Sequence, residues 1–171
     1  MSQAVIALGT NRGDRIGNLN QAIRAISRLP GVRITAGSKV YETDPVGFTD
    51  QKRFYNAVIL VEADVSPQML LGGCLGIEAA MGRVRTEKTG PRVIDLDLLL
   101  YENYKSESFD LTLPHPRILE RAFVLKPLSD IFPSGRALGL LFAPALREID
   151  DTGVDETEYE LIIPEAETDD M

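Results

Sequence analysis

The sequence predicts an α+β fold, a ferredoxin-like βαββαβ sandwich with an antiparallel sheet, helices on one face and a C-terminal extension. The order of the elements carries this prediction, because the apolar patterns follow one another as strand, helix, strand, strand, helix, strand. A doubly wound parallel fold would need a helix between the second and third strands. Residues 44–53, which join those strands, contain Pro45, Gly47 and Asp50 and show no helical spacing of apolar residues.

The first half of the predicted core contains a strand, a helix with one apolar face and a second strand. "AVIALGT" at 4–10 is a short apolar run that ends near a glycine, as expected of a buried strand. Asn18 is the expected N-cap of the helix, and the helical pattern stops at Pro30 and Gly31. "VRITAGSKVYET" at 32–43 alternates imperfectly and is predicted to be a strand.

The rest of the predicted core is a strand, a helix and a final strand. "FYNAVILVEAD" at 54–64 has a β-branched centre typical of a strand. Ser66 and Pro67 supply the N-cap and the first-turn proline of a helix that runs to about Met81. "VIDLDLLLY" at 93–101 is apolar on both faces apart from two aspartates, so we expect a central strand that is covered on both sides.

Beyond the last predicted strand, prolines leave room only for a short helix around 117–123. We assign residues 1–147 to one domain and residues 148–171 to an acidic C-terminal tail, which we expect to be mobile. Within the tail, "YELII" at 159–163 could add an edge strand or pack locally. No chemistry is assigned to the tail.

The tail also accounts for the acidic composition. The 171-residue chain has 26 Asp and Glu against 18 Lys and Arg, a net charge of −8. Eleven of these acids and none of the bases lie in residues 148–171, so the remaining 147 residues have a net charge of +3. A mildly cationic body suits a small anionic ligand, whereas nucleic-acid binding would need a larger basic surface. We therefore expect no nucleic-acid partner.

The sequence shows no sign of a membrane or of disulfide chemistry. No apolar run approaches the roughly 18–20 residues that a membrane-spanning helix needs, and "MSQAVIALGT" lacks the basic segment of a signal peptide. We expect a soluble, monomeric, cytoplasmic protein. The single cysteine, Cys74, lies among apolar residues and is expected to be a small buried side chain without a catalytic role.

Asp95 and Asp97 are the first candidates for chemistry. Residues i and i+2 of a strand project to the same face, about 6.5–7 Å apart, so both carboxylates can reach one site. Two hard carboxylates with little nitrogen or sulfur nearby suit Mg²⁺, which commonly bridges protein carboxylates and nucleotide phosphates. The alternative is that they lie at an exposed strand end, or pair with Arg92 and another basic residue.

A basic loop precedes these carboxylates. "GRVRTEKTGPR" at 82–92 contains Arg83, Arg85, Lys88 and Arg92, and the planar fork of arginine matches phosphate oxygens. A basic loop beside a carboxylate pair favours metal-dependent phosphoryl or nucleotidyl transfer. A solvated basic loop would account for the charges but not for their position.

The only histidine, His115, stands between two prolines in "LTLPHPRILERAF". A lone histidine is more often structural, but Arg117 and Arg121 follow closely, so His115 could donate a hydrogen bond to a phosphate. The chain has no GxxxxGK[ST] phosphate loop, no GxGxxG segment and no nucleophile elbow. Use of ATP would therefore need a different phosphate site.

Five ordered blocks make the chain similar to a known family. They are "ALGTNRGDR", "YETDPVGFTDQKRFYNAV", "IEAAMGRVR", "GPRVIDLDLLLY" and "LTLPHPRILERAFVLKPLSDI", and they fall within residues 4–133. The chain resembles the 6-hydroxymethyl-7,8-dihydropterin pyrophosphokinases of folate biosynthesis, whose signature is the GPRxxDLD block. The resemblance also implies a ferredoxin-like core.

The resemblance implies a site for ATP with two Mg²⁺ ions. Asp95 and Asp97 would hold the ions against the phosphates, and catalysis would depend on them together with Arg83 and Arg92. Arg85 and Lys88 would lie on a mobile loop that closes over the triphosphate. The residues that would bind the nucleotide are Glu78, Arg83, Arg85, Arg92, Thr112, His115 and Arg121.

The resemblance also implies a site for a pterin alcohol. The ring would lie between Phe123 and an aromatic residue of the third strand, either Phe54 or Tyr55, and blockwise matching favours Phe54. Asn56 would hydrogen-bond the edge of the ring. The residues that would line this pocket from the second loop are Thr43, Pro45 and Val46.

The implied reaction is in-line attack by the hydroxymethyl oxygen on the β-phosphorus of ATP, with AMP leaving. No side chain stands out as a general base, so positioning and electrostatics would supply most of the rate. Thr89 stands where some relatives have a tryptophan that stacks on the pterin. Two alternatives remain open: another Mg²⁺-dependent kinase or nucleotidyltransferase with this core, and a non-catalytic ferredoxin-like binding module.

Overall fold

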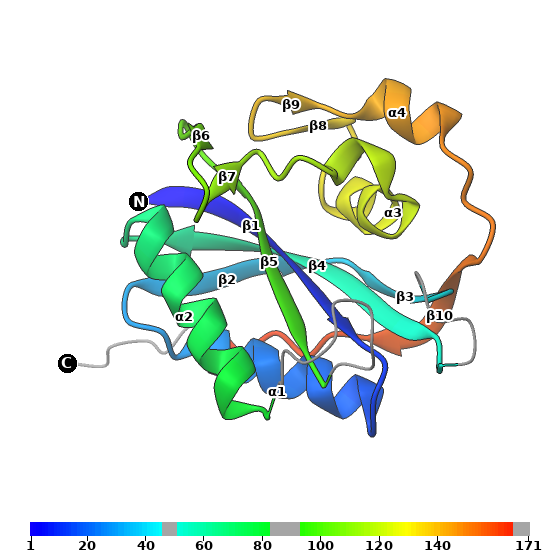
Figure 1. Ribbon diagram of the computed structural model, residues 1–171, viewed down its shortest axis with the longest axis horizontal. Helices are drawn as coiled ribbons and strands as arrows, with labels where there is room; N and C mark the ends of the chain where they lie inside the picture. Colours follow the sequence, from blue (N-terminus) through cyan, green and yellow to red (C-terminus); the bar gives the residue numbers. More distant parts are fainter. Residues whose placement is uncertain (46–50, 83–92, 166–171) are drawn as a thin grey trace.

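The computed structural model describes residues 1–45, 51–82 and 93–165, and Figure 1 shows their arrangement. Its centre is a six-stranded sheet in the order β10-β3-β4-β1-β5, in which β2 also pairs with β4. The strands are β1 (Ser2–Thr10), β2 (Val32–Gly37), β3 (Lys39–Thr43), β4 (Phe54–Ala63), β5 (Asp95–Tyr101) and β10 (Val154–Glu160). Every pairing in this sheet is antiparallel, which confirms an α+β fold with an antiparallel sheet.

Two helices, α1 (Arg15–Ser27) and α2 (Pro67–Ala80), cover one face of the sheet. α1 begins earlier than expected, because its N-cap is Asp14, whose carboxylate accepts a hydrogen bond from Gly17 N–H. The predicted N-cap of α2 is confirmed, since Ser66 Oγ accepts from Met69 N–H at 3.1 Å. Apolar residues of both helices form the larger core with the sheet; among them are Leu19, Ile23, Ile26, Leu70, Cys74 and Ile77.

A second layer covers the opposite face, so the expectation of helices on one face is wrong. This layer consists of η1 (Ile118–Glu120), α3 (Ala122–Ile131), β8 (Arg136–Ala137), β9 (Leu140–Leu141) and α4 (Ala143–Glu148). Val5 and Val58 of the sheet share a buried cluster with Leu125 and Leu128 of α3. The helix was missed because Pro127 lies inside α3, where proline removes one helical hydrogen bond.

Strand β5 is covered on both sides as predicted, but it forms an edge of the sheet and not its centre. Leu96 belongs to the core under α1 and α2, whereas Leu99 belongs to the cluster under α3. The short helix expected around 117–123 is also displaced, because η1 ends at Glu120 and the longer α3 follows. A hairpin of β6 (Ser106–Glu107) and β7 (Thr112–Leu113) joins β5 to this layer.

The predicted strand at 32–43 is two strands separated at Ser38. Ser38 N–H donates to Val58 O at 2.9 Å, and Val58 N–H donates to Ser38 Oγ at 2.8 Å. The side chain thus replaces a backbone partner where the strand breaks. Both β2 and β3 can then pair with the single long strand β4.

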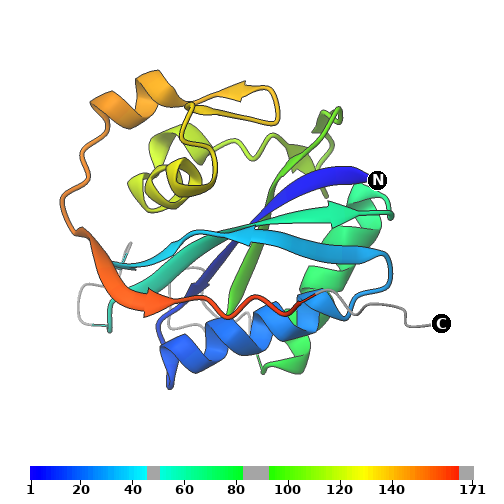
Figure 2. The same ribbon diagram turned by 180° about the vertical axis from the view of Figure 1, so that it is seen from behind.

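Part of the acidic tail is a strand, as one interpretation of "YELII" allowed. β10 pairs with the edge strand β3, and Leu161 and Ile163 then pack against the core. Figure 2 shows the chain descending from α4 into β10 and continuing beside α1. Residues 148–165 therefore lie largely against the body, while the division of the chain into residues 1–147 and a tail stays a prediction.

Cys74 is buried in the core, as expected. Burial, reinforced by the nearby carboxylates of Glu78 and Asp97, raises the pKa of its thiol to about 12.

Within residues 1–45, 51–82 and 93–165, no helix is long and apolar enough to cross a membrane.

Replacing Ser38 by alanine is expected to destabilise the protein by about 1–3 kcal/mol, because Val58 N–H would lose its acceptor in a buried place. Ser38 is only 5% exposed. The free energy of unfolding in urea measures the loss. Ser27→Ala is the matched control, because its hydroxyl donates to Arg24 O at an exposed helix end and its loss should change stability by about 0.5 kcal/mol or less. Equal losses for both variants would contradict the role given to Ser38.

Candidate active site

Antiparallel pairing brings four strand ends to one end of the sheet. The C-terminal ends of β1 and β3 lie beside the N-terminal ends of β4 and β5. Gly9 of β1 stands opposite Asn56 of β4 on one side and opposite Asp95 of β5 on the other. Residues from three parts of the sequence thereby meet on the face that α3 covers.

A cavity of about 710 Å³ lies at this end of the sheet, between the strand ends and the start of α3. It brings together most of the predicted site residues that the structure describes. Those that line it are Thr43, Phe54, Asn56, Asp95, Asp97, His115, Arg121 and Phe123.

Other predicted residues do not line the cavity or lie outside the described part of the chain. Pro45 does not line the cavity, although its neighbour Asp44 does, and the hydroxyl of Thr112 donates to Ser108 O on an exposed hairpin. Glu78 is 3% exposed and accepts a hydrogen bond from Leu96 N–H at 2.9 Å. It therefore holds the backbone between the two aspartates, and its predicted contact with a nucleotide stays a prediction. The predicted residues that lie outside the described part of the chain are Val46, Arg83, Arg85, Lys88, Thr89 and Arg92.

Asp95 and Asp97 line the cavity from one face of β5, as the strand period requires. Both are partly buried, so a cation would be held beside low-dielectric walls. In the described part of the chain, no three His, Cys, Asp or Glu residues gather as a complete metal cage. A carboxylate pair fits Mg²⁺ in particular, which is usually bound by one or two carboxylates together with substrate phosphates.

His115 lines the cavity and is held by hydrogen bonds to its backbone and to its ring. The backbone N–H of His115 donates to Leu99 O at 2.8 Å. Its ring Nδ1 accepts from the backbone N–H of Arg117 at 3.2 Å. Burial, followed by the charges of Arg121 and Arg117, lowers the pKa of His115, and Asp95 opposes this shift. The imidazole is therefore neutral at neutral pH with its proton on Nε2, which makes it a hydrogen-bond donor.

The other side of the cavity is built from an amide, a hydroxyl and two aromatic rings. Asn56 Nδ2 donates to Thr43 Oγ1 at 2.6 Å. This pair requires glycine at position 9, since a Cβ there would lie 2.7 Å from Asn56 Oδ1. Phe54 and Phe123 also line the cavity, and the guanidinium of Arg121 lies 5.5 Å from the centre of the Phe123 ring.

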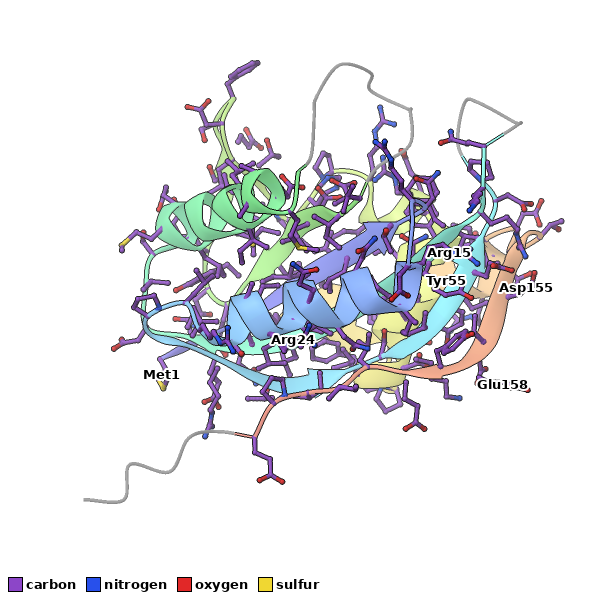
Figure 3. The ribbon with its side chains drawn as sticks, turned by 90° about the horizontal axis from the view of Figure 1, so that it is seen from below. Met1, Arg15, Arg24, Tyr55, Asp155 and Glu158 are labelled. Carbon is purple, nitrogen blue, oxygen red and sulfur yellow. The ribbon has the colours of Figure 1, made fainter. Side chains whose placement is uncertain are left out.

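Tyr55, the alternative to Phe54, belongs to the opposite face of the sheet. Its ring packs under the guanidinium of Arg15, 3.8 Å from the ring centre, and against the ring of Tyr159. Figure 3 shows Arg15 and Tyr55 together on the side of α1. Phe54 is thus the aromatic residue of β4 that faces the cavity.

Sequence reasoning missed one wall of the cavity. Asp150, Thr152, Gly153 and Val154 line it, although they belong to the segment to which no chemistry was assigned. Only the turn-like "DDTG" at 150–153 hints at a defined structure there.

The arrangement defines a class of protein: an enzyme whose pocket is charged and polar on one side and aromatic on the other. A carboxylate pair, a neutral imidazole donor and an arginine lie on one side, and two aromatic rings with an amide lie on the other. The chain belongs to the 7,8-dihydro-6-hydroxymethylpterin-pyrophosphokinase family, whose model matches residues 5–133.

Known proteins agree with this membership. The chain is 42% identical to the 2-amino-4-hydroxy-6-hydroxymethyldihydropteridine pyrophosphokinase of Methylorubrum extorquens over 92% of this chain and 100% of that protein. It is 44% identical to the mitochondrial folate synthesis bifunctional protein of Pisum sativum over 75% of this chain, but it spans only 25% of that protein. A crystal structure of HPPK-DHPS in complex with substrates shares the fold, with a TM-score of 0.64 and 16% identity over 85% of this chain and 43% of that chain.

We expect the pKa of His115 in the folded protein to lie below its ordinary value of 6.5, because burial and two arginines disfavour the imidazolium. As the only histidine, it gives a single imidazole signal in a protein prepared without a histidine tag. Nitrogen-15 NMR titration should report a neutral ring at pH 7 with the proton on Nε2. The urea-unfolded protein is the control, and a folded-state midpoint at or above the unfolded one would contradict the geometry.

Proposed function

We propose that this protein transfers the pyrophosphate group of ATP to the hydroxymethyl group of 6-hydroxymethyl-7,8-dihydropterin, as a step of folate biosynthesis. The products would be AMP and the pterin diphosphate. One observation carries the proposal: a single cavity holds both the carboxylate pair of β5 and the Phe54, Asn56 and Phe123 set. Membership of the pyrophosphokinase family supports it.

Asp95 and Asp97 would hold the metal with their carboxylates, and we propose two Mg²⁺ ions in the loaded site. Bound Mg²⁺ would neutralise phosphate charge and draw the two substrates together. Glu78 would keep the two aspartates in place, because it binds the backbone N–H of Leu96 between them. This contact would hold the backbone from which both carboxylates project.

His115 and Arg121 would bind the phosphate oxygens. The neutral imidazole would donate a hydrogen bond from Nε2 to a phosphate oxygen. Because the ring is already neutral, this hydrogen bond would not be lost as the pH rises above 7. Arg121 precedes the first turn of α3, so its guanidinium and the positive end of the helix dipole would face the same anion. Arg83 and Arg92, which the family resemblance assigns to catalysis, and Arg85 would add further contacts.

The pterin ring would lie between Phe54 and Phe123, with its polar edge on Asn56 and Thr43. Aromatic faces and a fixed amide select a planar ring with hydrogen-bonding edges. The hydroxymethyl oxygen would then point toward the carboxylate side, where it attacks the β-phosphorus. The bond from this phosphorus to the AMP oxygen breaks, and the alcohol proton passes to solvent.

Several broader features belong to the same proposal. The strand order, with β1 between β4 and β5 and with β2 and β3 on the far side of β4, supports the ferredoxin-like class. A monomeric state, a cytoplasmic location and the lack of a nucleic-acid partner stay predictions.

The test is an assay of the purified protein with ATP, Mg²⁺ and 6-hydroxymethyl-7,8-dihydropterin in which the released nucleotide is identified. AMP formed in step with the pterin diphosphate is the expected result. Release of ADP would assign the site to a simple kinase. No nucleotide release from folded protein would overturn the proposal in favour of a binding module.

Substituting Asp97 by alanine should lower AMP release by at least about a hundredfold, because charge stabilisation at the phosphates would be lost. Asp64→Ala, at the exposed opposite end of β4, is the matched control and should retain normal turnover. Circular dichroism and thermal melting confirm that both variants are folded. Near-normal turnover by folded Asp97→Ala would sink the role given to the carboxylate pair.

A further inference from the structure

The C-terminal segment closes one side of the cavity. We call residues 150–154 the C-terminal wall, since Asp150, Thr152, Gly153 and Val154 line the cavity. The wall lies beyond residue 133, where the match to the family model ends. Figures 1 and 2 show this stretch passing from the layer of α3 and α4 to the sheet edge at β3.

The wall is attached at both of its sides. On the side of α3, Lys126 Nζ lies 2.7 Å from Asp151 Oδ2. On the side of the sheet, Gly153 O accepts a hydrogen bond of 3.0 Å from Asp44 N–H, and Val154 pairs with Thr43. The wall therefore spans the gap between the helix that carries Phe123 and the strand that carries Thr43, which is the pterin side of the proposed site.

Arg53 is the residue in which these contacts converge. Its Nη2 donates to Gly153 O at 3.0 Å and to Asp155 at 2.8 Å. Its Nε and Nη1 donate to Asp44 and Glu42, each at 3.0 Å. One guanidinium thus joins the end of β3 to the C-terminal wall.

This cluster should hold the wall more firmly than a single surface ion pair would. An exposed pair contributes about 0–1 kcal/mol, but the rigid fork of arginine holds several acceptors in one arrangement. The hydrogen bond to Asp155 is the main cause that raises the pKa of Arg53, so the guanidinium stays charged. Arg15 extends the cluster by pairing with Glu42 at 2.8 Å.

Gly153 makes the close approach possible. Its φ of +80° suits glycine, and a Cβ there would lie 2.1 Å from Asp44 Oδ2. An alanine at this position would therefore force the wall and the side chain of Asp44 apart, which disturbs the contact of Asp44 with Arg53 without removing any charge.

We propose that Arg53 is a positioning residue for the pterin pocket: it holds the C-terminal wall against the end of β3 and thereby helps determine affinity for the pterin alcohol. The inference rests on the proposed function. Arg53 does not line the cavity, so it acts through the wall and through Thr43. Because the wall adjoins Thr43 and not the carboxylates of β5, its loosening should weaken pterin binding more than ATP binding or turnover.

Two substitutions test this by different routes. Arg53→Met keeps the length of the side chain and removes the fork, whereas Gly153→Ala disturbs the contact between the wall and Asp44 by steric overlap. Each should raise KM for the pterin alcohol by about fivefold or more, with kcat and KM for ATP changed less than about twofold. Arg53→Lys keeps the charge without the fork and should fall between wild type and Arg53→Met.

Each substitution has a matched control. Arg33→Met removes an exposed pair with Glu62, 2.7 Å apart, between β2 and β4. Gly139→Ala places alanine at a φ of +89° where no atom lies within 4 Å of the new Cβ. Both controls should leave the two KM values unchanged.

Hydrogen exchange provides a readout that does not depend on turnover. Peptides covering residues 150–160 should exchange faster in Arg53→Met than in wild type, while peptides of α2 should not change.

The inference is overturned if Arg53→Met and Gly153→Ala leave KM for the pterin within twofold of wild type, or if KM and kcat for both substrates change together as they would after general loss of fold. If wild type neither turns over nor binds the pterin alcohol in calorimetry, the proposed function fails and the inference falls with it. Normal wild-type turnover with unaffected variants refutes the inference alone.

Discussion

The pairing of β1 with β4 on one side and β5 on the other is the constraint on which the site depends. It places Gly9 opposite Asn56 and Asp95 at once. A slip of one residue would turn the polar side chains of a strand to the other face. The core prevents this, because Ile6 and Leu8 of β1 are buried under α1 and α2, and burial of each such side chain contributes about 1.5–3 kcal/mol. The apolar face therefore holds the polar face in register.

The second face of the sheet is divided between a core and a pocket. Leu125 and Leu128 of α3 pack on Val5 and Val58, so this helix is fixed over the middle of the sheet. Its first residues reach the strand ends, where Arg121 and Phe123 line the cavity. Packing of the later residues of α3 on the sheet thus positions its first residues at the cavity. The same helix therefore contributes both to stability and to the candidate site.

The sequence was sufficient to predict much of the fold, and most of the described site candidates line one cavity. Predictions were correct where a local sequence signal determines the structure. Examples are the N-cap at Ser66 and the two aspartates that lie two residues apart on β5. Prediction was wrong where a tertiary contact overrides a local rule. Pro127 argued against a helix, yet burial of its neighbours keeps α3 helical. Ser38 divides a strand through a hydrogen bond to Val58, a partner that is 20 residues away.

The C-terminal wall shows the same limit more sharply. Its acidic residues indicated a solvated tail, since composition alone cannot reveal that Arg53 and Lys126 lie in position to bind it. The role of the wall follows from contacts across about a hundred residues of chain, which no local pattern records.

A crystal structure of the protein with Mn²⁺, a non-hydrolysable ATP analogue and the pterin alcohol tests the central claim most directly. The account predicts anomalous density for the metal between the carboxylates of Asp95 and Asp97, with the pterin ring between Phe54 and Phe123 and its hydroxymethyl group directed at the β-phosphorus. Metal bound elsewhere, or a pterin ring outside the cavity at the ends of β1, β4 and β5, would contradict it.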